Sequence, residues 1–200
     1  MKMGILMNDV QNDKKLLRSS FKAIRTKLSS DFVISRSEII YKKFTKLINI
    51  RKFNSICVYI SFNNEVLTNS IVDLALKSGV RVAVPYVVND FDMKLKFIND
   101  YNNDIHFKSR LSNPEPKLDL EDANISDISM FIVPALAFDE KCNRLGFSKG
   151  YYDRMLDSNK NALRIGLAYD YQILPNLPKE SHDEILDLII SENKIVTAIF

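Results

Sequence analysis

A strand–helix–strand pattern between residues 55 and 84 constrains the fold of this chain more than any other feature. Ser55–Phe62 is a short apolar run of the kind that forms a buried strand. Residues 68–78 form a predicted helix with a threonine at its start and a glycine just after its end. Arg81–Val84 is the next predicted strand, and Pro85 closes it. Strands joined by such a helical crossover run parallel, so a parallel sheet covered by helices is expected.

Further apolar runs extend this sheet. Met130–Val133 and Leu163–Ala168 have the length and composition of buried strands. Asp92–Ile98 alternates polar and apolar residues, which predicts an antiparallel or edge strand. Ile185–Ser191 and Ile195–Phe200 flank a polar turn and predict a terminal hairpin. The expected fold is a three-layer α/β/α sandwich with a largely parallel, Rossmann-like sheet and antiparallel edge strands.

Two amphipathic helices are predicted before the sheet. The first covers residues 14–28, where four large apolar residues recur at helical spacing. A second stripe on it is basic and consists of Lys14, Arg18, Lys22 and Arg25. This stripe fits either a solvated lysine-rich face or a surface that faces an anion. Ser35–Glu38 matches a capping box, so the second helix is predicted to start near Arg36.

The length of 200 residues predicts a single domain covering 1–200. No apolar run approaches the roughly 20 residues of a spanning helix, and the N-terminus lacks signal-peptide features. The two cysteines, Cys57 and Cys142, are expected to be reduced thiols. We therefore expect a cytoplasmic protein without a membrane partner. Residues 99–127 are polar and predict a long irregular excursion, with room for short strands.

The stretch Phe131–Arg154 carries the strongest functional signal. After the strand at its start comes a turn-rich segment with two glycines, Gly146 and Gly150, among basic residues and tyrosines. Glycines allow the backbone to approach an anion closely, and Arg and Lys neutralise its charge. The composition fits a phosphate-binding loop between a strand and a helix, although an ordinary surface turn has a similar composition.

Ligands of open α/β sheets bind beyond the carboxyl ends of the strands. Three marked positions are expected there, namely Glu65, residues 139–153 and Asp170. Dinucleotide and Walker motifs are absent, and no serine or cysteine lies in a nucleophile elbow. Cys142 and His182 are interpreted as an incidental thiol and a solvated histidine. The remaining chemistry is charge neutralisation and positioning, which phosphoryl transfer requires.

Several segments in a fixed order resemble the 5-formyltetrahydrofolate cyclo-ligase family, also called 5,10-methenyltetrahydrofolate synthetases. The central one is Val133–Asp139 followed by Asn143–Gly146 and Lys149–Arg154. The others are the basic pair Lys14 and Arg18, the segments Tyr59–Ser61 and Asn64–Val66, and the closing residues Gln172, His182 and Asp183. The resemblance covers nearly the whole chain.

This resemblance implies an ATP-dependent ligase of one-carbon metabolism. It would convert 5-formyltetrahydrofolate, in free or polyglutamylated form, and ATP into 5,10-methenyltetrahydrofolate, ADP and phosphate. The implied cofactor is Mg²⁺, with ATP as co-substrate. A monomer is expected, with no nucleic acid as partner.

The resemblance also implies roles for residues of this chain. Lys149 and Arg144 are the expected catalytic cations, and Asp153 and Asp183 the magnesium carboxylates. Ile60, Glu65 and Tyr151 would contact the folate. ATP would be held by Lys14, Lys15, Leu16, Leu17, Arg18, Arg144, Leu145, Gly146, Phe147, Ser148, Lys149, Gly150, Tyr151 and Tyr152.

Two positions depart from the family pattern. Ala135 stands where the family usually has glycine, which is a conservative change. Ser148 replaces a glycine of the central loop, and a positive φ there would strain the serine by about 1 kcal/mol or more. A folate- or nucleotide-binding protein on the same scaffold, with reduced or lost turnover, is therefore an alternative function. A nucleic-acid-associated protein that uses the basic helix is a third.

Overall fold

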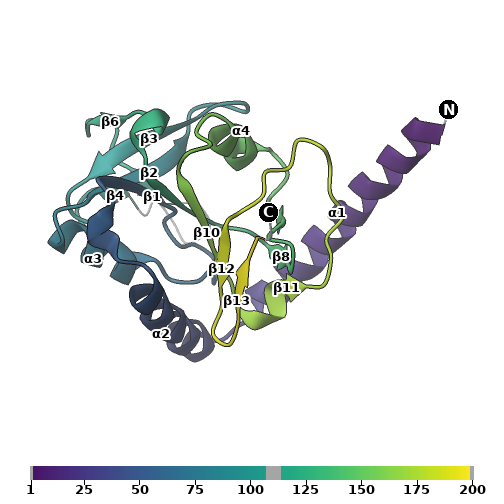
Figure 1. The fold of residues 1–200 in the computed structure, drawn as a ribbon, viewed down its shortest axis with the longest axis horizontal. Coiled ribbons are helices and arrows are strands. Elements are labelled where there is room, and N and C mark those ends of the chain that lie inside the picture. Colours follow the sequence, from purple (N-terminus) through teal and green to yellow (C-terminus); the bar gives the residue numbers. More distant parts are fainter. Residues whose placement is uncertain (1, 107–113, 199–200) are drawn as a thin grey trace.

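The computed structural model describes residues 2–106 and 114–198, and Figure 1 shows its arrangement. Within these residues the main sheet has eight strands. In spatial order they are β13 (Ile195–Thr197), β12 (Leu188–Ile190), β10 (Leu163–Leu167), β7 (Met130–Val133), β1 (Ser55–Val58), β2 (Arg81–Val87), β3 (Met93–Ile98) and β6 (Asp122–Ala123). Neighbouring strands from β12 to β2 are parallel, and the pairs beyond them are antiparallel. The predicted sheet is confirmed.

The helices and smaller elements complete the fold. The α-helices are α1 (Lys2–Thr26), α2 (Ser30–Leu47), α3 (Asn69–Lys77) and α4 (Tyr151–Asp157). The 3₁₀ turns are η1 (Ile50–Lys52), η2 (Ile125–Asp127) and η3 (Asp170–Gln172). Two small sheets consist of β11 (Ile173–Leu174), β8 (Ala137–Asp139) and β9 (Arg144–Leu145), and of β4 (Ile105–His106) and β5 (Glu115–Pro116).

Alternating side chains of the central strands form the two cores. Ile56 and Ile132 pack in the same cluster as Phe44 of α2 and Ile71 of α3. The intervening residues, such as Phe131, pack on the opposite face with Met155 and Leu156 of α4. Figure 1 shows α2 and α3 on one side of the sheet and α4 on the other. The three-layer α/β/α architecture is therefore confirmed, because the strands bury apolar side chains on both faces.

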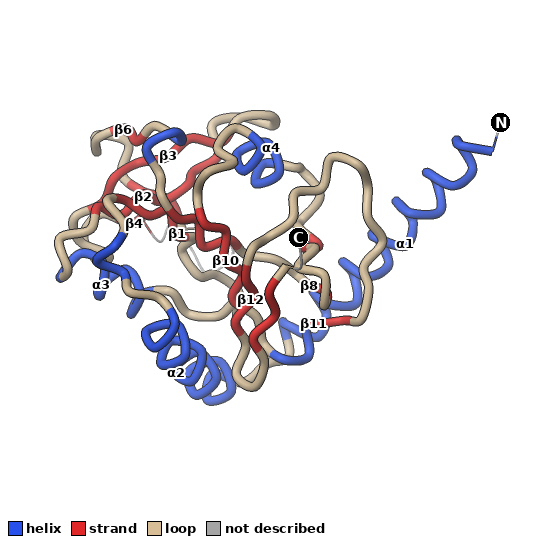
Figure 2. Tube along the Cα trace, viewed as in Figure 1, coloured by secondary structure: helices blue, strands red, loops and turns tan. Residues whose placement is uncertain are grey.

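The helix α1 is longer than expected. It begins at Lys2 rather than Lys14 and ends at Thr26 rather than Leu28. Figure 1 and Figure 2 both show its N-terminal part projecting beyond the rest of the molecule, while its C-terminal part lies beside the sheet. Among the described residues, no helix combines the length and apolar character needed to cross a membrane.

The predicted start of the second helix was wrong. α2 begins at Ser30, and Ser29 is its N-cap, with a side-chain oxygen that accepts from the Phe32 amide at 3.2 Å. Ser35 lies within the helix, where its hydroxyl donates to the Phe32 carbonyl. The capping-box pattern misled because a Ser-x-x-Glu sequence is also compatible with a helix interior. The buried Val33, before the expected start, belongs to the same core face as the later apolar residues.

Other predicted boundaries shift in the same region. β1 ends at Val58 rather than Phe62, because the Tyr59 carbonyl accepts from the buried hydroxyl of Thr68 instead of a neighbouring strand. Gly79, with φ of 75°, ends α3 as predicted. β2 does not stop at Pro85 but continues to Val87, paired with β3. Pairing with β1 ends at Ala83, so no hydrogen bond to β1 is required from the proline nitrogen, which has no hydrogen to donate. Of the 99–127 excursion, residues 107–113 lie outside the described residues, and the rest contains the expected short strands.

Candidate active site

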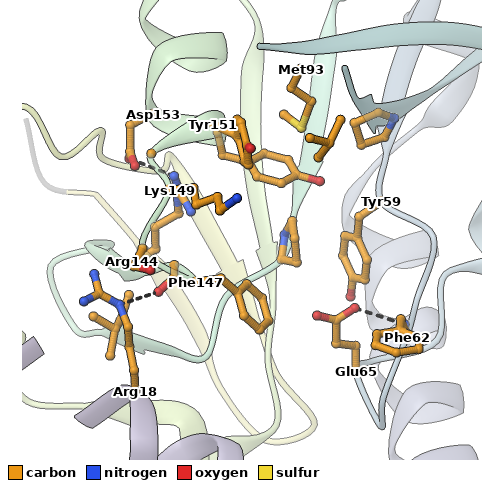
Figure 3. A pocket seen from close by; sticks show the side chains of 18 of the residues that line it. Arg18, Tyr59, Phe62, Glu65, Met93, Arg144, Phe147, Lys149, Tyr151 and Asp153 are labelled. Atoms are coloured by element: carbon orange, nitrogen blue, oxygen red, sulfur yellow. Dashed lines mark hydrogen bonds and ion pairs between the residues drawn. The ribbon is translucent and has the colours of Figure 1, made fainter. Parts of the chain in front are cut away.

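A cleft of about 980 Å³ lies beyond the carboxyl ends of the central parallel strands. Tyr59 and Ile60 follow β1 at its wall, Tyr86 belongs to the end of β2, and Pro134 follows β7. Figure 3 shows Arg18, Arg144, Lys149 and Asp153 on one side, Tyr59, Phe62 and Glu65 on the other, and the Phe147 ring between them. The site is therefore at the sheet edge where the sequence predicted it.

The basic stripe of α1 forms one wall of this cleft. All four of its members, Lys14, Arg18, Lys22 and Arg25, line it. Lys14 is only 3 % exposed and Arg25 only 2 % exposed. The solvated-face interpretation therefore does not hold for Lys14 and Arg25, and the stripe as a whole, including the exposed Lys22, lines the cleft.

Lys14 is held by two carboxylates from the distant C-terminal loop. Its Nζ donates to Glu180 Oε2 at 2.7 Å and to Asp183 Oδ2 at 2.5 Å. Asp183 also accepts from the Glu180 amide at 2.7 Å. The bond from Lys14 is the main reason why the pKa of Glu180 lies below its usual value. These contacts fix the start of the predicted ATP-binding helix segment against the closing motif of the chain.

Arg18 joins α1 to the central loop. Its Nε donates to the Gly146 carbonyl at 2.9 Å. Burial lowers the pKa of Arg18, while the charges of Glu180, Asp183 and Asp153 act in the opposite direction. The charges of three carboxylates therefore act on one guanidinium, and this part of the cleft combines cations with oxygen donors.

The turn before the central loop is organised by Asp139, which is 1 % exposed. Its Oδ1 accepts from the amides of Lys141 and Asn143 at 2.9 Å each, and its Oδ2 accepts from the Leu177 amide at 2.9 Å. Asp139 thus has a structural role in the cleft wall. It closes the hairpin that delivers Arg144 to the site.

Arg144 and Asp153 form an ion pair within the loop and helix α4. Nη2 of Arg144 donates to Oδ1 of Asp153 at 2.7 Å, and the Glu184 amide donates to the same oxygen at 3.3 Å. The Arg144 guanidinium lies 5.6 Å from the centroid of the Tyr152 ring. Gly150, with φ of 65°, allows the chain to turn into α4 just before these residues.

Lys149 and Ser148 occupy the mouth of the cleft. Lys149 Nζ pairs with Asp90 Oδ1 at 2.5 Å, and both side chains are more than half exposed. Tyr151 donates to the Asn89 carbonyl at 2.9 Å, so the loop between β2 and β3 contacts the start of α4. Ser148 has φ of 103°, the conformation anticipated for a position where the family has glycine.

The opposite wall carries Ile60 and Glu65. Glu65 Oε1 pairs with Arg25 at 3.1 Å, and Oε2 accepts from the Phe62 amide at 3.0 Å. Burial raises the pKa of Glu65, and the Arg25 charge together with these hydrogen bonds opposes that rise. A carboxylate at the base of an apolar wall is suited to accept N–H groups of a planar heterocycle.

Some predicted site residues lie away from the cleft lining. Lys15 and Leu16 are exposed on α1, and Leu17 packs against the small cluster around Leu136. Asp170 bonds to Ser191 and Asn193 in a separate turn. The remaining predicted site residues all line the cleft, and they are Lys14, Arg18, Ile60, Glu65, Arg144, Leu145, Gly146, Phe147, Ser148, Lys149, Gly150, Tyr151, Tyr152, Asp153 and Asp183.

Cys142 fits its interpretation as an incidental thiol, whereas His182 is exposed as expected but also lines the cleft. Cys142 is fully buried, and burial raises the pKa of its thiol to about 11, which disfavours a nucleophilic thiolate. His182 is exposed and lies 4.0 Å from Glu180.

The structure adds lining residues that sequence reasoning missed. Glu180 has no motif around it, and the pairing of Arg25 with Glu65 spans 40 positions. Tyr86 and Met93 come from the end of β2 and the start of β3. Only the basic stripe pointed to Arg25, because its spacing places it on the same helix face as Lys14 and Arg18.

Oxygen donors gather at one end of the cleft. Glu180, His182 and Asp183 have ligand atoms within 4.8 Å of one another. Asp153 lies within electrostatic reach of the same arginine as Glu180 and Asp183. Carboxylates and few nitrogen donors match the preference of Mg²⁺, so the donor set is compatible with that ion.

The fold and site define an α/β protein with a cleft for a large anionic ligand, lined by cations on one side and by a buried carboxylate on the other. A family model described as the 5-formyltetrahydrofolate cyclo-ligase family matches residues 10–192. The chain belongs to this family and is one of its cyclo-ligase enzymes.

Individual relatives agree with this assignment. The 5-formyltetrahydrofolate cyclo-ligase of Escherichia coli K12 is 32% identical over 146 residues, which cover 71% of this chain and 80% of the relative. A probable 5-formyltetrahydrofolate cyclo-ligase of Schizosaccharomyces pombe is 28% identical over 92% of this chain and 97% of its own length. The NMR structure of the Aquifex aeolicus 5,10-methenyltetrahydrofolate synthetase superposes with a TM-score of 0.79 at 27% identity, covering 92% of both chains. The similarity therefore extends over nearly the whole fold.

Proposed function

We propose that this protein closes 5-formyltetrahydrofolate to 5,10-methenyltetrahydrofolate with consumption of ATP. The observation that carries the proposal is the distribution of charge across one cleft. The cations of α1 and of residues 144–149 line one wall, and Glu65 lies on the other. A triphosphate suits the first wall and a pterin with several N–H donors suits the second.

The proposed reaction needs no protein nucleophile. The formyl oxygen attacks the γ-phosphorus of ATP, and the bond to the leaving ADP breaks. The N10 amine then attacks the activated formyl carbon, loses its proton, and expels phosphate as the C–O bond breaks. The protein supplies orientation and stabilises negative charge, the two factors that dominate catalysis of phosphoryl transfer.

The nucleotide is proposed to bind along α1 and the central loop, in contact with Lys14, Arg18 and residues 144–152. Lys149, at the mouth, and Arg144, at the base, are the proposed catalytic cations. The Lys149 side chain is 57 % exposed, and its contacts in the described part of the chain are with Asp90 and the Tyr151 ring, so it can turn toward a γ-phosphate by leaving an exposed ion pair. Ile60, Glu65 and Tyr151 are proposed to contact the folate.

Magnesium is the proposed metal, held by Asp153 and Asp183, and Glu180 and His182 offer further ligand atoms within 4.8 Å of Asp183. When bound, the ion would neutralise charge on the phosphates. In this structure Asp183 is paired with Lys14, and Asp153 with Arg144. To hold the metal, Asp183 would therefore have to release Lys14 or share its charge with it, and Asp153 would have to do the same with Arg144.

The finer features of the biological setting are also proposals. Both cysteines are free and buried, which supports a reducing compartment such as the cytoplasm. The protein is also proposed to act as a monomer. The folate substrate is proposed to be accepted with or without a polyglutamate tail.

An absorbance assay at the methenyltetrahydrofolate band tests the proposal. Purified protein with 5-formyltetrahydrofolate should give a signal that requires both ATP and Mg²⁺, and chelation of the metal should abolish it. ADP should form in equal amount. Absence of both products, with an intact fold, would overturn the proposed function.

A binding protein without turnover is the second candidate. It is favoured by Ser148 at φ of 103° in the loop that holds the phosphates, since strain there can weaken the loop's fit to ATP. Folate binding without ADP release would support it. A nucleic-acid partner is disfavoured because the α1 stripe lines the cleft, with Lys14 and Arg25 buried in ion pairs. Weak binding to DNA and RNA with little salt dependence would remove that third hypothesis.

A further inference from the structure

Arg25 is a buried cation in the last turn of α1 that neither the family motif nor the proposed mechanism uses. It lines the cleft, and its Nη1 lies 3.1 Å from Oε1 of Glu65. Within the described part of the chain, its buried Nε has no hydrogen-bond acceptor. A buried guanidinium with spare donor capacity is costly to keep unless it serves a purpose at the site.

The loop that carries Glu65 is attached to the same end of α1 by a second set of contacts. Nδ2 of Asn64 donates to the carbonyls of Arg25 and Leu28 at 2.9 and 3.2 Å. Asn63 and Asn64 both have positive φ, 50° and 60°, a conformation that asparagine tolerates better than most residues. This tight turn places the Glu65 carboxylate where it accepts from the backbone amide of Phe62 and from Arg25. The position of Glu65 therefore depends on the end of α1.

The same guanidinium also contacts the central loop. Its central carbon lies 5.1 Å from the centroid of the Phe147 ring, within the range of a cation–π contact. Phe147 belongs to the loop proposed to hold ATP. Arg25 is thus in contact with one residue from the folate side and one from the nucleotide side.

We propose that Arg25 is a positioning residue for the folate: it holds Glu65 ionised and in place as the acceptor for N–H groups of the pterin ring. This inference rests on the proposed function, and in particular on the placement of the pterin at Glu65. Arg25 acts through Glu65, with the shared contact to Phe147 keeping the guanidinium in place.

The groups around Glu65 make its ionisation depend on Arg25. The facing titratable side chains are Arg25 from α1, Tyr59 after β1, Tyr152 from α4 and Tyr169 after β10. Burial raises the pKa of all three tyrosines, so they stay neutral near pH 7. Arg25 is therefore the facing cation that favours the charged carboxylate. Its removal raises the pKa of Glu65 further, and folate binding is then lost at a higher pH as the solution is acidified.

Four variants test this inference, after turnover by the wild-type protein has been measured. Arg25→Met should raise KM for 5-formyltetrahydrofolate at least tenfold at pH 7 and change KM for ATP less than threefold. The acid limb of its kcat/KM profile for folate should move to higher pH. Arg25→Lys should restore the wild-type limb at least in part. Glu65→Gln should remove the limb, and Arg25→Met added to Glu65→Gln should change folate KM less than threefold further.

Controls separate this role from a loss of folding. Lys27→Met removes an exposed cation just beyond the same helix and should leave both KM values unchanged. If Arg25→Met does not fold, two other variants still test the role of Arg25 in folate binding. One is Arg25→Lys, and the other is the double variant, which leaves no buried charge unpaired. Binding of 5-formyltetrahydrofolate without ATP, measured by calorimetry, should follow the folate KM.

An unchanged folate KM and pH profile in Arg25→Met would overturn the inference. The inference would also be overturned if the fold-increase in folate KM of the double variant equalled the product of the two single-variant increases. A wild-type protein that binds neither folate nor ATP would instead overturn the proposed function. The two failures are therefore distinguishable.

Discussion

Arg144 donates from Nη2 to Oδ1 of Asp153 at 2.7 Å, and the Arg144 side chain is almost fully buried. A predicted catalytic cation and a predicted magnesium carboxylate are thus hydrogen-bonded partners in the cleft. The pair connects β9 to α4 and shapes the central loop before any substrate arrives. Substitutions of either residue therefore affect both the fold and the chemistry.

Asp153→Ala should lower the free energy of unfolding by about 3 kcal/mol, because it leaves a buried guanidinium without its partner. It should also reduce turnover at least tenfold, or about 1.4 kcal/mol. Urea unfolding and the absorbance assay measure the two effects. Asp153→Asn keeps a hydrogen-bond acceptor for Arg144, so most of the stability should return while turnover stays low. Full stability in Asp153→Ala would contradict the structural role of the pair.

Lys149→Ala should reduce turnover at least tenfold, about 1.4 kcal/mol of transition-state stabilisation, with the fold intact. The free energy of unfolding should stay essentially unchanged, because the ion pair with Asp90 is exposed and screened by solvent. Lys160→Ala is the matched control, since Lys160 is also an exposed lysine paired with an aspartate, Asp157. Wild-type kcat in Lys149→Ala would remove Lys149 from the catalytic residues.

The parallel core was predictable because its strands are short apolar runs flanked by turn residues. Met130–Val133 was placed with its correct bounds, since it is buried on both faces and Pro134 follows it. The start of α2 was missed because Ser29 and Ser35 offer similar local caps, and only tertiary burial of Val33 decides between them. The course of β2 through Pro85 depends on where its neighbour β1 ends, which no local pattern records.

The candidate site was predictable where residues are close in sequence and hidden where pairing is long-range. The central loop places Arg144 to Tyr152 together by its own continuity. The bond between Lys14 and Asp183 joins residues 169 positions apart, and no spacing rule anticipates it. Helix periodicity indicated that the α1 cations share a face, but only the packing of α1 showed which surface that face meets.

Lys14 should make part of the stability pH-dependent. The pKa of Glu180 lies below its usual 4.5, chiefly through the hydrogen bond from Lys14. A carboxylate with a lowered pKa contributes stability that is present above pH 4.5 and is lost as the pH falls through its folded value. The Tm difference between wild type and Lys14→Met should therefore shrink as the pH falls below 4.5 and through the folded-state pKa of Glu180.

The control for this experiment is Lys42→Met, which removes an exposed partner of Glu38 on α2. That variant should show a much smaller Tm difference at every pH, because solvent screens the exposed pair. A Lys14→Met difference that stays constant from pH 7 to 3 would contradict the assigned cause of the Glu180 shift.

Ser148→Gly should stabilise the protein and improve its fit to ATP. Relief of the strain at φ of 103° is worth about 1–3 kcal/mol, against about 0.5–1 kcal/mol for the added freedom of glycine in the unfolded chain. The net gain should be on the order of 1 kcal/mol by urea unfolding, with a lower KM for ATP. Ser78→Gly, at φ of −90°, should be destabilising, because serine is unstrained there. If Ser148→Gly loses stability as Ser78→Gly does, relief of backbone strain at Ser148 is not the dominant effect and this prediction is wrong.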